Sequence, residues 1–187
     1  LIIAISFLCL FAFSAQEDYK SYIDKLGLNL EEVEYITKDR YVNSAWVITS
    51  KNVPKNNKSM ILQHGLLDGG WTWLVLGQKS LAYVLANQGY TVYLSYIRGT
   101  QFSKSHLDYN SVNPISPYWD FSFQEMAEYD LPALIEFIKK RDGVKKVDYA
   151  GHSQGTMMFF LAYMNNPSYL EENISHYIAL ATVPNIN

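Results

Sequence analysis

The chain has 187 residues, of which 49% are hydrophobic and 18% charged, a composition typical of a globular protein rather than a disordered one. Its net charge is −3 and its longest basic run is Lys-Lys-Arg at 139–141, which argues against a nucleic acid or an anionic membrane surface as partner. Aromatic residues reach 15%, which we interpret as a tyrosine-rich core and surface, although such side chains also line apolar pockets.

The first thirteen residues, LIIAISFLCLFAF, carry no charge and are too short to span a bilayer comfortably. Small residues near positions 12–15 and the polar stretch after them are typical of a secretory cleavage zone. We therefore interpret residues 1–15 as the remnant of a signal peptide, with a buried helix or a membrane anchor as the alternative. Cys9 is the only cysteine, so we expect neither a disulfide nor thiol chemistry in the mature part.

Hydrophobic spacing predicts alternating strands and helices along the rest of the chain. Residues 18–38 are mixed and charged and predict only a short helix over 18–26, and a long polar connection is expected over 98–119. Pro132 lies inside a helical run and predicts a kink or a second helix start. Strands are predicted over 41–50, 60–65, 90–97, 144–151 and 174–181, and helices over 76–89, 121–143 and 154–166.

This alternation predicts an α/β fold, in which a mostly parallel sheet is covered by helices on both faces. The printed chain stops a few residues beyond the last predicted strand, where sheets of this kind usually continue. We therefore expect residues 16–187 to be the N-terminal part of a single larger domain.

The five residues GHSQG (151–155) match the pattern G-x-S-x-G between a predicted strand and a predicted helix. The chain must turn sharply there, so only glycine fits two positions before and after the turn, and the Ser153 hydroxyl is pushed out above the sheet. Free N–H groups at the start of the helix suit the oxyanion of acyl transfer. We interpret Ser153 as a nucleophile placed by Gly151 and Gly155; the alternative is a structural glycine-rich turn.

A second glycine corner follows the predicted strand over 60–65. Gly65 lets the chain turn, so the backbone N–H of Leu66 can point into the same site as the N–H of Gln154. Two such donors would form an oxyanion hole. His64 is not expected to be the catalytic base, because in this architecture the base follows the nucleophile in the chain.

Four segments of the chain resemble the acid lipase family, the gastric and lysosomal lipases of the α/β-hydrolase fold. They are LQHGLL (62–67), LANQGYTVYLSYIRGT (85–100), YWDFSFQEMAEYDLPALIEFI (118–138) and YAGHSQGT (149–156). The resemblance is collinear over residues 17–187 and implies an α/β-hydrolase fold, truncated here before the lid and the C-terminal strands. It also implies a secreted or lysosomal enzyme that hydrolyses triacylglycerols or cholesteryl esters at a lipid–water interface, without metal or organic cofactor.

By position in this resemblance, Ser153 is the nucleophile, Leu66 and Gln154 supply the oxyanion N–H groups, and the catalytic Asp and His lie beyond Asn187. Within the printed chain no competent base is therefore expected, and the acidic residues that precede the serine come in the wrong order. His106, His152 and His176 are expected to be surface or packing histidines. A solvated acidic helix face is expected for Asp120, Glu125, Glu128 and Asp130.

Two features depart from the family pattern. Tyr96 and Ile97 stand where the family tends to have Asn-Ser before Arg-Gly, and ALATVP follows the last strand in place of an Ala-Pro-Val turn. These differences concern the substrate pocket rather than the class of protein. Asn57 and Asn173 lie in Asn-x-Ser triplets and are candidate N-glycosylation sites on a secretory route.

Two other functions are compatible with these residues. A peptidase or thioesterase of the same fold fits the serine corner, but not the distinctive block DFSFQEMAEYDLPA (120–133). A non-catalytic lipid-binding or interaction protein would keep the fold without a complete set of catalytic residues. A downstream Asp and His, in that order, would support the lipase interpretation.

Overall fold

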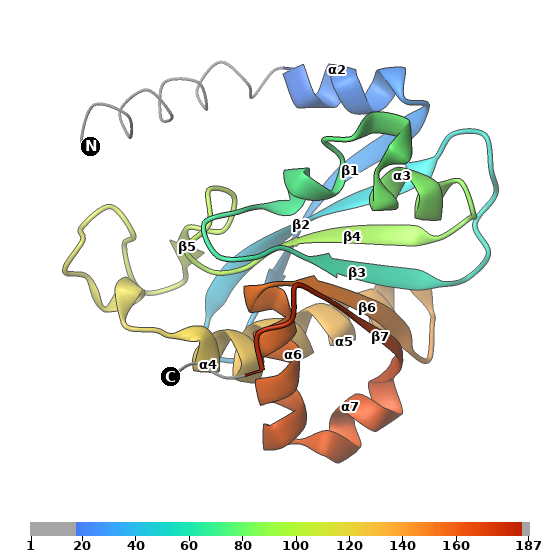
Figure 1. Ribbon diagram of the computed structural model, residues 1–187. Coiled ribbons are helices and arrows are strands. Elements are labelled where there is room, and N and C mark those ends of the chain that lie inside the picture. The colour runs from blue at the N-terminus through green and yellow to red at the C-terminus, as the bar shows by residue number, and fades with distance from the viewer. Residues whose placement is uncertain (1–17, 185–187) are drawn as a thin grey trace.

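The computed structural model describes residues 18–184 of the chain (Figure 1). The predicted signal peptide remnant and Cys9 lie outside the described residues. Over the described range, no helix has the length and apolar character needed to cross a bilayer.

The described residues form a single sheet with helices on both sides. The strands are β1 (Leu28–Ile36), β2 (Tyr41–Ser50), β3 (Ser59–Gln63), β4 (Thr91–Tyr96), β5 (Ser105–His106), β6 (Val147–His152) and β7 (Ile174–Leu180). The α-helices are α2 (Asp18–Lys25), α3 (Leu81–Ala86), α4 (Phe123–Glu125), α5 (Leu131–Asp142), α6 (Gln154–Asn165) and α7 (Pro167–Asn173). Short turns of other helix types are η1 (Gly70–Trp73), η2 (Gly77–Lys79), η3 (Pro117–Trp119) and the π-helical turn η4 (Met126–Asp130).

The strand order is β1-β2-β4-β3-β6-β7, with β5 paired to β2. Strands β4, β3, β6 and β7 run parallel, whereas β1 and β2 form an antiparallel hairpin that joins the sheet through β2 and β4. The carboxyl ends of β3, β4 and β6 therefore meet at one edge, which is where open α/β sheets place their binding crevice. The predicted mostly parallel α/β fold is confirmed.

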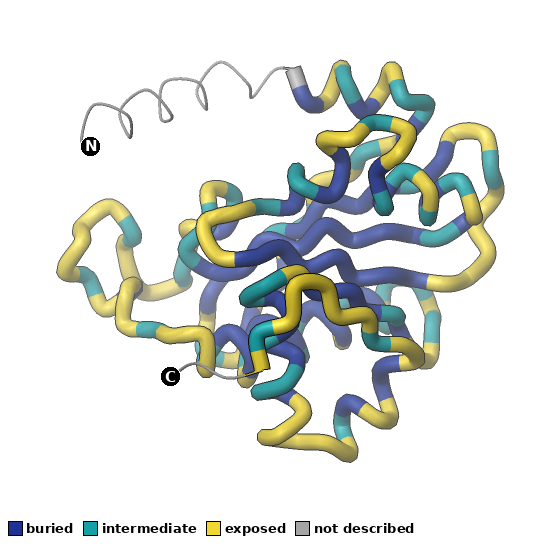
Figure 2. Tube along the Cα trace, in the orientation of Figure 1, coloured by how far each residue is buried: buried dark blue, intermediate teal, exposed yellow. Residues whose placement is uncertain are grey.

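Side chains of the central strands alternate between two apolar layers. In β2, Trp46 and Ile48 face a cluster that includes residues of α2 and α3, whereas Val47 faces a cluster that includes residues of α5 and α6. Figure 1 shows these helix pairs on opposite sides of the sheet, and Figure 2 shows the central strands buried between them. Burial on both faces explains why these strands appear in the sequence as nearly continuous hydrophobic runs.

The helical run over 121–143 is divided, as Pro132 predicted. Helix α4 begins at a capping box in which the Ser122 N–H donates to the Glu125 carboxylate at 2.6 Å. The π-helical turn η4 follows, and α5 starts at Leu131 with Pro132 in its first turn, where a missing N–H costs no helical hydrogen bond.

Several elements differ from the sequence prediction, including the two-residue strand β5 inside the predicted polar connection. Strand β1 was not predicted, because Glu31, Glu32 and Glu34 obscure the alternation of a strand with few buried side chains. Helix α7 was not predicted either, and the predicted helix over 76–89 is reduced to η2 and the short α3.

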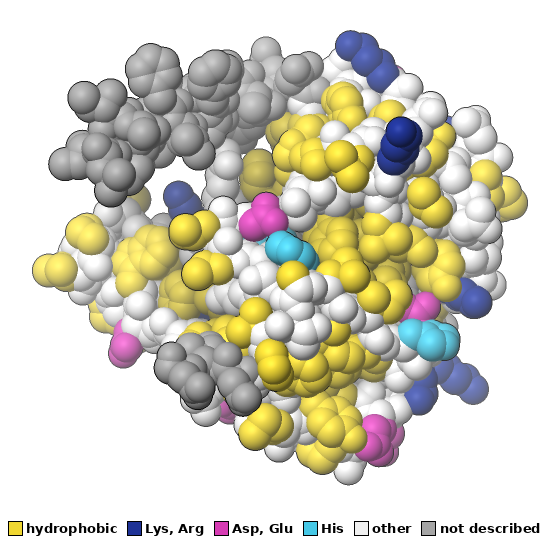
Figure 3. All heavy atoms as spheres, viewed as in Figure 1, with side chains coloured by type: hydrophobic (Ala, Val, Ile, Leu, Met, Phe, Trp, Pro, Cys, Tyr) yellow, Lys and Arg dark blue, Asp and Glu magenta, His cyan; other side chains and the backbone are white. Residues whose placement is uncertain are grey.

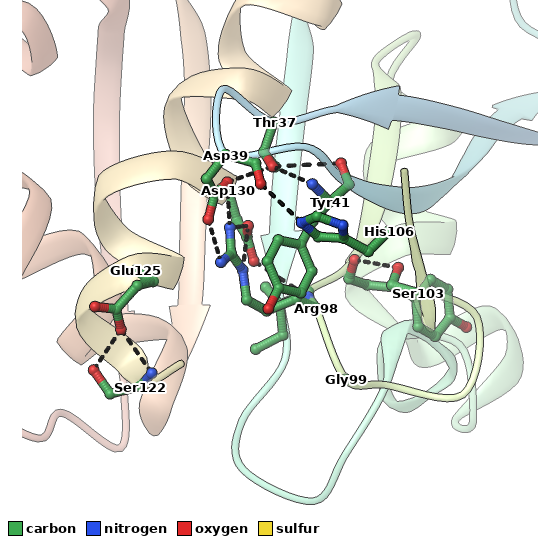
Figure 4. A network of polar contacts seen from close by, with 12 residues as sticks. Thr37, Asp39, Tyr41, Arg98, Gly99, Ser103, His106, Ser122, Glu125 and Asp130 are labelled. Carbon is green, nitrogen blue, oxygen red and sulfur yellow. Dashed lines mark hydrogen bonds and ion pairs between the residues drawn. The ribbon is translucent and has the colours of Figure 1, made fainter. Parts of the chain in front are cut away.

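The prediction that Asp130 belongs to a solvated acidic helix face is wrong. Its side chain is 1% exposed and pairs with Arg98, whose own side chain is fully buried. The Arg98 Nε and Nη2 donate to the Asp130 carboxylate at 2.9 and 2.6 Å, and the Arg98 backbone N–H donates to it at 3.2 Å (Figure 4). Asp130 thus joins the helical layer to the segment that follows β4.

Arg98 also reaches the β1–β2 hairpin. Its Nη1 and Nη2 donate to the Asp39 carboxylate at 2.6 and 2.9 Å, and its guanidinium lies 3.8 Å from the centre of the Tyr41 ring (Figure 4). A buried guanidinium needs such complete pairing, because its desolvation is otherwise costly. One side chain therefore ties together the hairpin, the end of β4 and the start of α5.

Candidate active site

Ser153 occupies the corner between β6 and α6. Its backbone has φ 51° and ψ −113°, a positive-φ conformation that residues other than glycine adopt only with strain. Its N–H donates to Leu180 O at 3.0 Å, and its carbonyl accepts from the Thr156 N–H at 2.9 Å and the Thr156 hydroxyl at 2.6 Å. These bonds hold the strained corner, and the side chain of Ser153 is half-buried at the carboxyl edge of the sheet.

The two glycines of the motif are required by close backbone contacts. A β carbon at Gly151 would lie 2.6 Å from the carbonyl carbon of Gly155, and one at Gly155 would lie 2.8 Å from the carbonyl oxygen of Gln63. Backbone atoms cannot move aside as a flexible side chain can. The contact between Gly151 and Gly155 is the crowding expected of a sharp turn, and Gly155 in addition packs against the end of β3.

The loop after β3 lies against the serine corner. A β carbon at Gly65 would lie 3.2 Å from the Ser153 Cβ, so the backbone of this loop touches the corner itself. The N–H of Leu66 follows directly, and the N–H of Gln154 lies at the first position of α6. Within residues 18–184, neither N–H donates to a protein acceptor outside regular secondary structure. Two uncommitted donors beside a serine can stabilise negative charge on an acyl oxygen.

His64 lies beneath this loop and is 1% exposed. Its Nδ1 is 2.8 Å from Gly65 O, an acceptor only, so Nδ1 carries the hydrogen and Nε2 the lone pair. Burial lowers the pKa of His64, so the ring is neutral. In the described part of the chain its buried Nε2 has no hydrogen-bond partner. His64 supports the loop.

The other histidines are engaged elsewhere. His106 Nε2 is 3.0 Å from Asp39 O, and the exposed His176 is 2.8 Å from the Asp148 carboxylate. His152 is exposed next to Gly65. Over residues 18–184, no histidine hydrogen-bonds to the Ser153 hydroxyl, and no group of three or more potential metal-binding side chains is found.

The two candidate glycosylation sites differ in accessibility. Asn57 is exposed in the turn before β3. Asn173 is 5% exposed, its amide nitrogen donates to Tyr169 O at 2.7 Å, and its oxygen accepts from Lys139. A glycan on the Asn173 amide nitrogen would have to fit beside Tyr169, whereas Asn57 is open to solvent. Both candidate sites stay predictions.

One contact near the site was not predicted from the sequence. Tyr96, the last residue of β4, packs its ring against Gly69 and Gly70 in the loop that follows β3. The adjacent glycines at 69–70 were the available signal, because a pair of glycines outside a predicted element indicates close approach of another group.

The chain belongs to the alpha/beta hydrolase fold family, whose model matches residues 58–186. Solved structures with the same fold include an esterase from Pyrococcus furiosus (TM-score 0.57, 20% identity, covering 80% of this chain and 50% of that one). Another is an epoxide hydrolase from Vigna radiata (TM-score 0.57, 18% identity, covering 86% and 40%).

Within that fold, the curated relatives are lipases, which confirms the resemblance to the acid lipase family. Gastric triacylglycerol lipase of Mus musculus is 40% identical over 166 residues, covering 86% of this chain and 41% of the lipase. Lipase member K of Homo sapiens is 40% identical over 177 residues, covering 90% and 43%. The chain thus spans less than half the length of these relatives.

Proposed function

We propose that the complete protein is a serine hydrolase of lipid carboxylic esters, with triacylglycerols or cholesteryl esters as substrates. The observation that carries the proposal is the position of Ser153: a hydroxyl on a strained strand-to-helix corner, against a loop with a free backbone N–H. The names of the curated relatives, gastric triacylglycerol lipases among them, support lipid esters as the substrate class.

In the proposed reaction, Ser153 Oγ attacks the ester carbonyl and gives its proton to a histidine held by an acidic residue. We expect both of these residues downstream of Asn187, as the resemblance to acid lipases implies. The N–H groups of Leu66 and Gln154 stabilise the oxyanion of the tetrahedral intermediate. The alcohol leaves with the proton from the histidine, and water then hydrolyses the acyl-enzyme to release the fatty acid.

The protein would act at a lipid–water interface on the secretory route, as a secreted or lysosomal enzyme. Exposed aliphatic side chains around the carboxyl edge of the sheet are compatible with such a surface: Leu67 is 99%, Val112 86% and Ile115 88% exposed. Val112 and Ile115 belong to the connection between β5 and η3, which projects from the body in Figure 1 and carries hydrophobic side chains in Figure 3. Gastric relatives agree with a secreted route.

Labelling with a fluorophosphonate tests the nucleophile. The full-length wild-type protein should react, Ser153→Ala should not, and Ser168→Ala, which changes an exposed serine at the start of α7, should react like wild type. Hydrolysis of emulsified triolein and cholesteryl oleate would then distinguish the two substrates. A folded full-length protein that stays unlabelled would favour the alternative, a lipid-binding or interaction protein without catalysis.

A further inference from the structure

Tyr96 fills the space beneath the loop that follows β3. A β carbon at Gly69 would lie 3.0 Å from the Tyr96 Cε1, and one at Gly70 would lie 3.0 Å from both Cε2 and Cζ. At Gly70 the Leu94 Cβ is closer still, at 2.8 Å. The aromatic ring thus occupies the volume that ordinary side chains at these two positions would need.

The ring is held in place from the sheet side. Tyr96 is 2% exposed and makes edge contacts with Trp46 and Phe102, with ring centres 5.2 and 4.9 Å apart. The His64 ring centre is 6.2 Å away, and His64 contacts Gly65 O directly. Tyr96 and His64 therefore support the two ends of the segment 65–70 from below.

The hydroxyl of Tyr96 contributes little to this support. It is buried and lies near the backbone of Trp71, but it makes no hydrogen bond of good geometry within the described residues. A buried hydroxyl without a good hydrogen bond lowers the stability of the fold, because its desolvation is not compensated. The contacts with Gly69 and Gly70 come from ring carbons, so the ring is the part of Tyr96 against which these glycines pack.

We propose that Tyr96 is a positioning residue, which sets the height of the loop at 65–70 above the sheet and so places the Leu66 N–H beside Ser153. This inference rests on the proposed function. It explains a departure from the acid lipase pattern: where the family tends to have Asn, this chain has a ring together with two glycines that make room for it. A smaller residue at position 96 would let the loop sink towards the sheet, and a larger one at position 69 would lift it off the Tyr96 ring.

Reciprocal substitutions in the full-length protein test the coupling. A β carbon at Gly69 would meet only atoms of the Tyr96 ring, whereas one at Gly70 would also meet Leu94, so Gly69 is the position to change. Gly69→Ala and Tyr96→Asn should each lower kcat for ester hydrolysis by about 10- to 100-fold with KM changed less than about threefold, because a misplaced donor weakens only the transition state. The double variant Tyr96→Asn/Gly69→Ala should recover at least about fivefold over Gly69→Ala. Tyr96→Phe, the conservative variant, keeps the ring and should restore kcat relative to Tyr96→Asn.

Hydrogen exchange of the peptide spanning 60–75 gives a readout that does not depend on catalysis. Exchange should be faster in Tyr96→Asn and Gly69→Ala than in wild type and Tyr96→Phe. Additive losses without recovery in the double variant, or a change confined to KM, would overturn the inference. If the wild-type protein hydrolyses no ester, the proposed function fails, whereas unchanged exchange in both single variants refutes the support by Tyr96 independently.

Discussion

Asp130→Asn should destabilise the fold more than any substitution of a surface carboxylate. The side chains of Arg98 and Asp130 are 0% and 1% exposed, whereas that of Asp39, the second partner of Arg98, is 26% exposed. Removing one member of a buried ion pair costs about 3–5 kcal/mol, because it leaves an uncompensated buried charge. Since Arg98 keeps Asp39, we expect the lower end, about 3 kcal/mol, which corresponds to a fall in Tm of roughly 6–12 °C.

Urea denaturation at pH 7 measures this loss directly. The matched control is Asp108→Asn, which removes a carboxylate that is 45% exposed and pairs with a 56% exposed Arg40. An exposed pair of this kind contributes about 0–1 kcal/mol. Replacing both buried partners, as in Arg98→Met/Asp130→Leu, should recover part of the loss because no fully buried charge is left unpaired; Asp39, which also loses Arg98, is 26% exposed and still accepts from the Thr37 hydroxyl. Equal losses below about 1 kcal/mol for Asp130→Asn and Asp108→Asn would refute the reasoning.

Two further predictions follow from contacts around Ser153. Gly151→Ala should cost about 1–3 kcal/mol or more and abolish fluorophosphonate labelling, because its β carbon would lie 2.6 Å from the Gly155 backbone. The control is Gly143→Ala, where nothing lies within 4 Å; its φ of 68° adds about 1–2 kcal/mol of backbone strain far from Ser153, and it should keep labelling. Burial lowers the pKa of His64 in the folded protein, so on acidification the unfolded chain binds a proton at this residue at a higher pH than the folded protein does. The unfolding free energy should therefore fall as the pH drops below about 6.5, by at most about 1.4 kcal/mol per pH unit. His64→Asn, which does not titrate, should lose this slope in denaturation curves between pH 7 and 5; an unchanged slope would contradict the assignment.

Local patterns in the sequence determined the strands that are buried on both faces and the corner at Ser153. A nearly continuous apolar run such as that of β4 has one stable place, inside a sheet covered on both sides. The small neighbours of Ser153 follow from the turn itself, because a strand that reverses into a helix within one residue leaves no room for a β carbon at Gly151 or Gly155. Such features depend on residues within a few positions of one another, so the sequence displays them.

Only the tertiary structure decided the role of side chains whose partners are distant in the chain. Asp130 lies among acidic residues of a helical run and has the appearance of a solvated group, yet it pairs with Arg98, 32 positions away. Arg98 in turn pairs with Asp39, 59 positions away, and Tyr96 packs beneath Gly70. The charge and the ring size of such a side chain can be read from the sequence. Whether the side chain is buried, and therefore must be paired, depends on how the sheet and the helical layers pack around it.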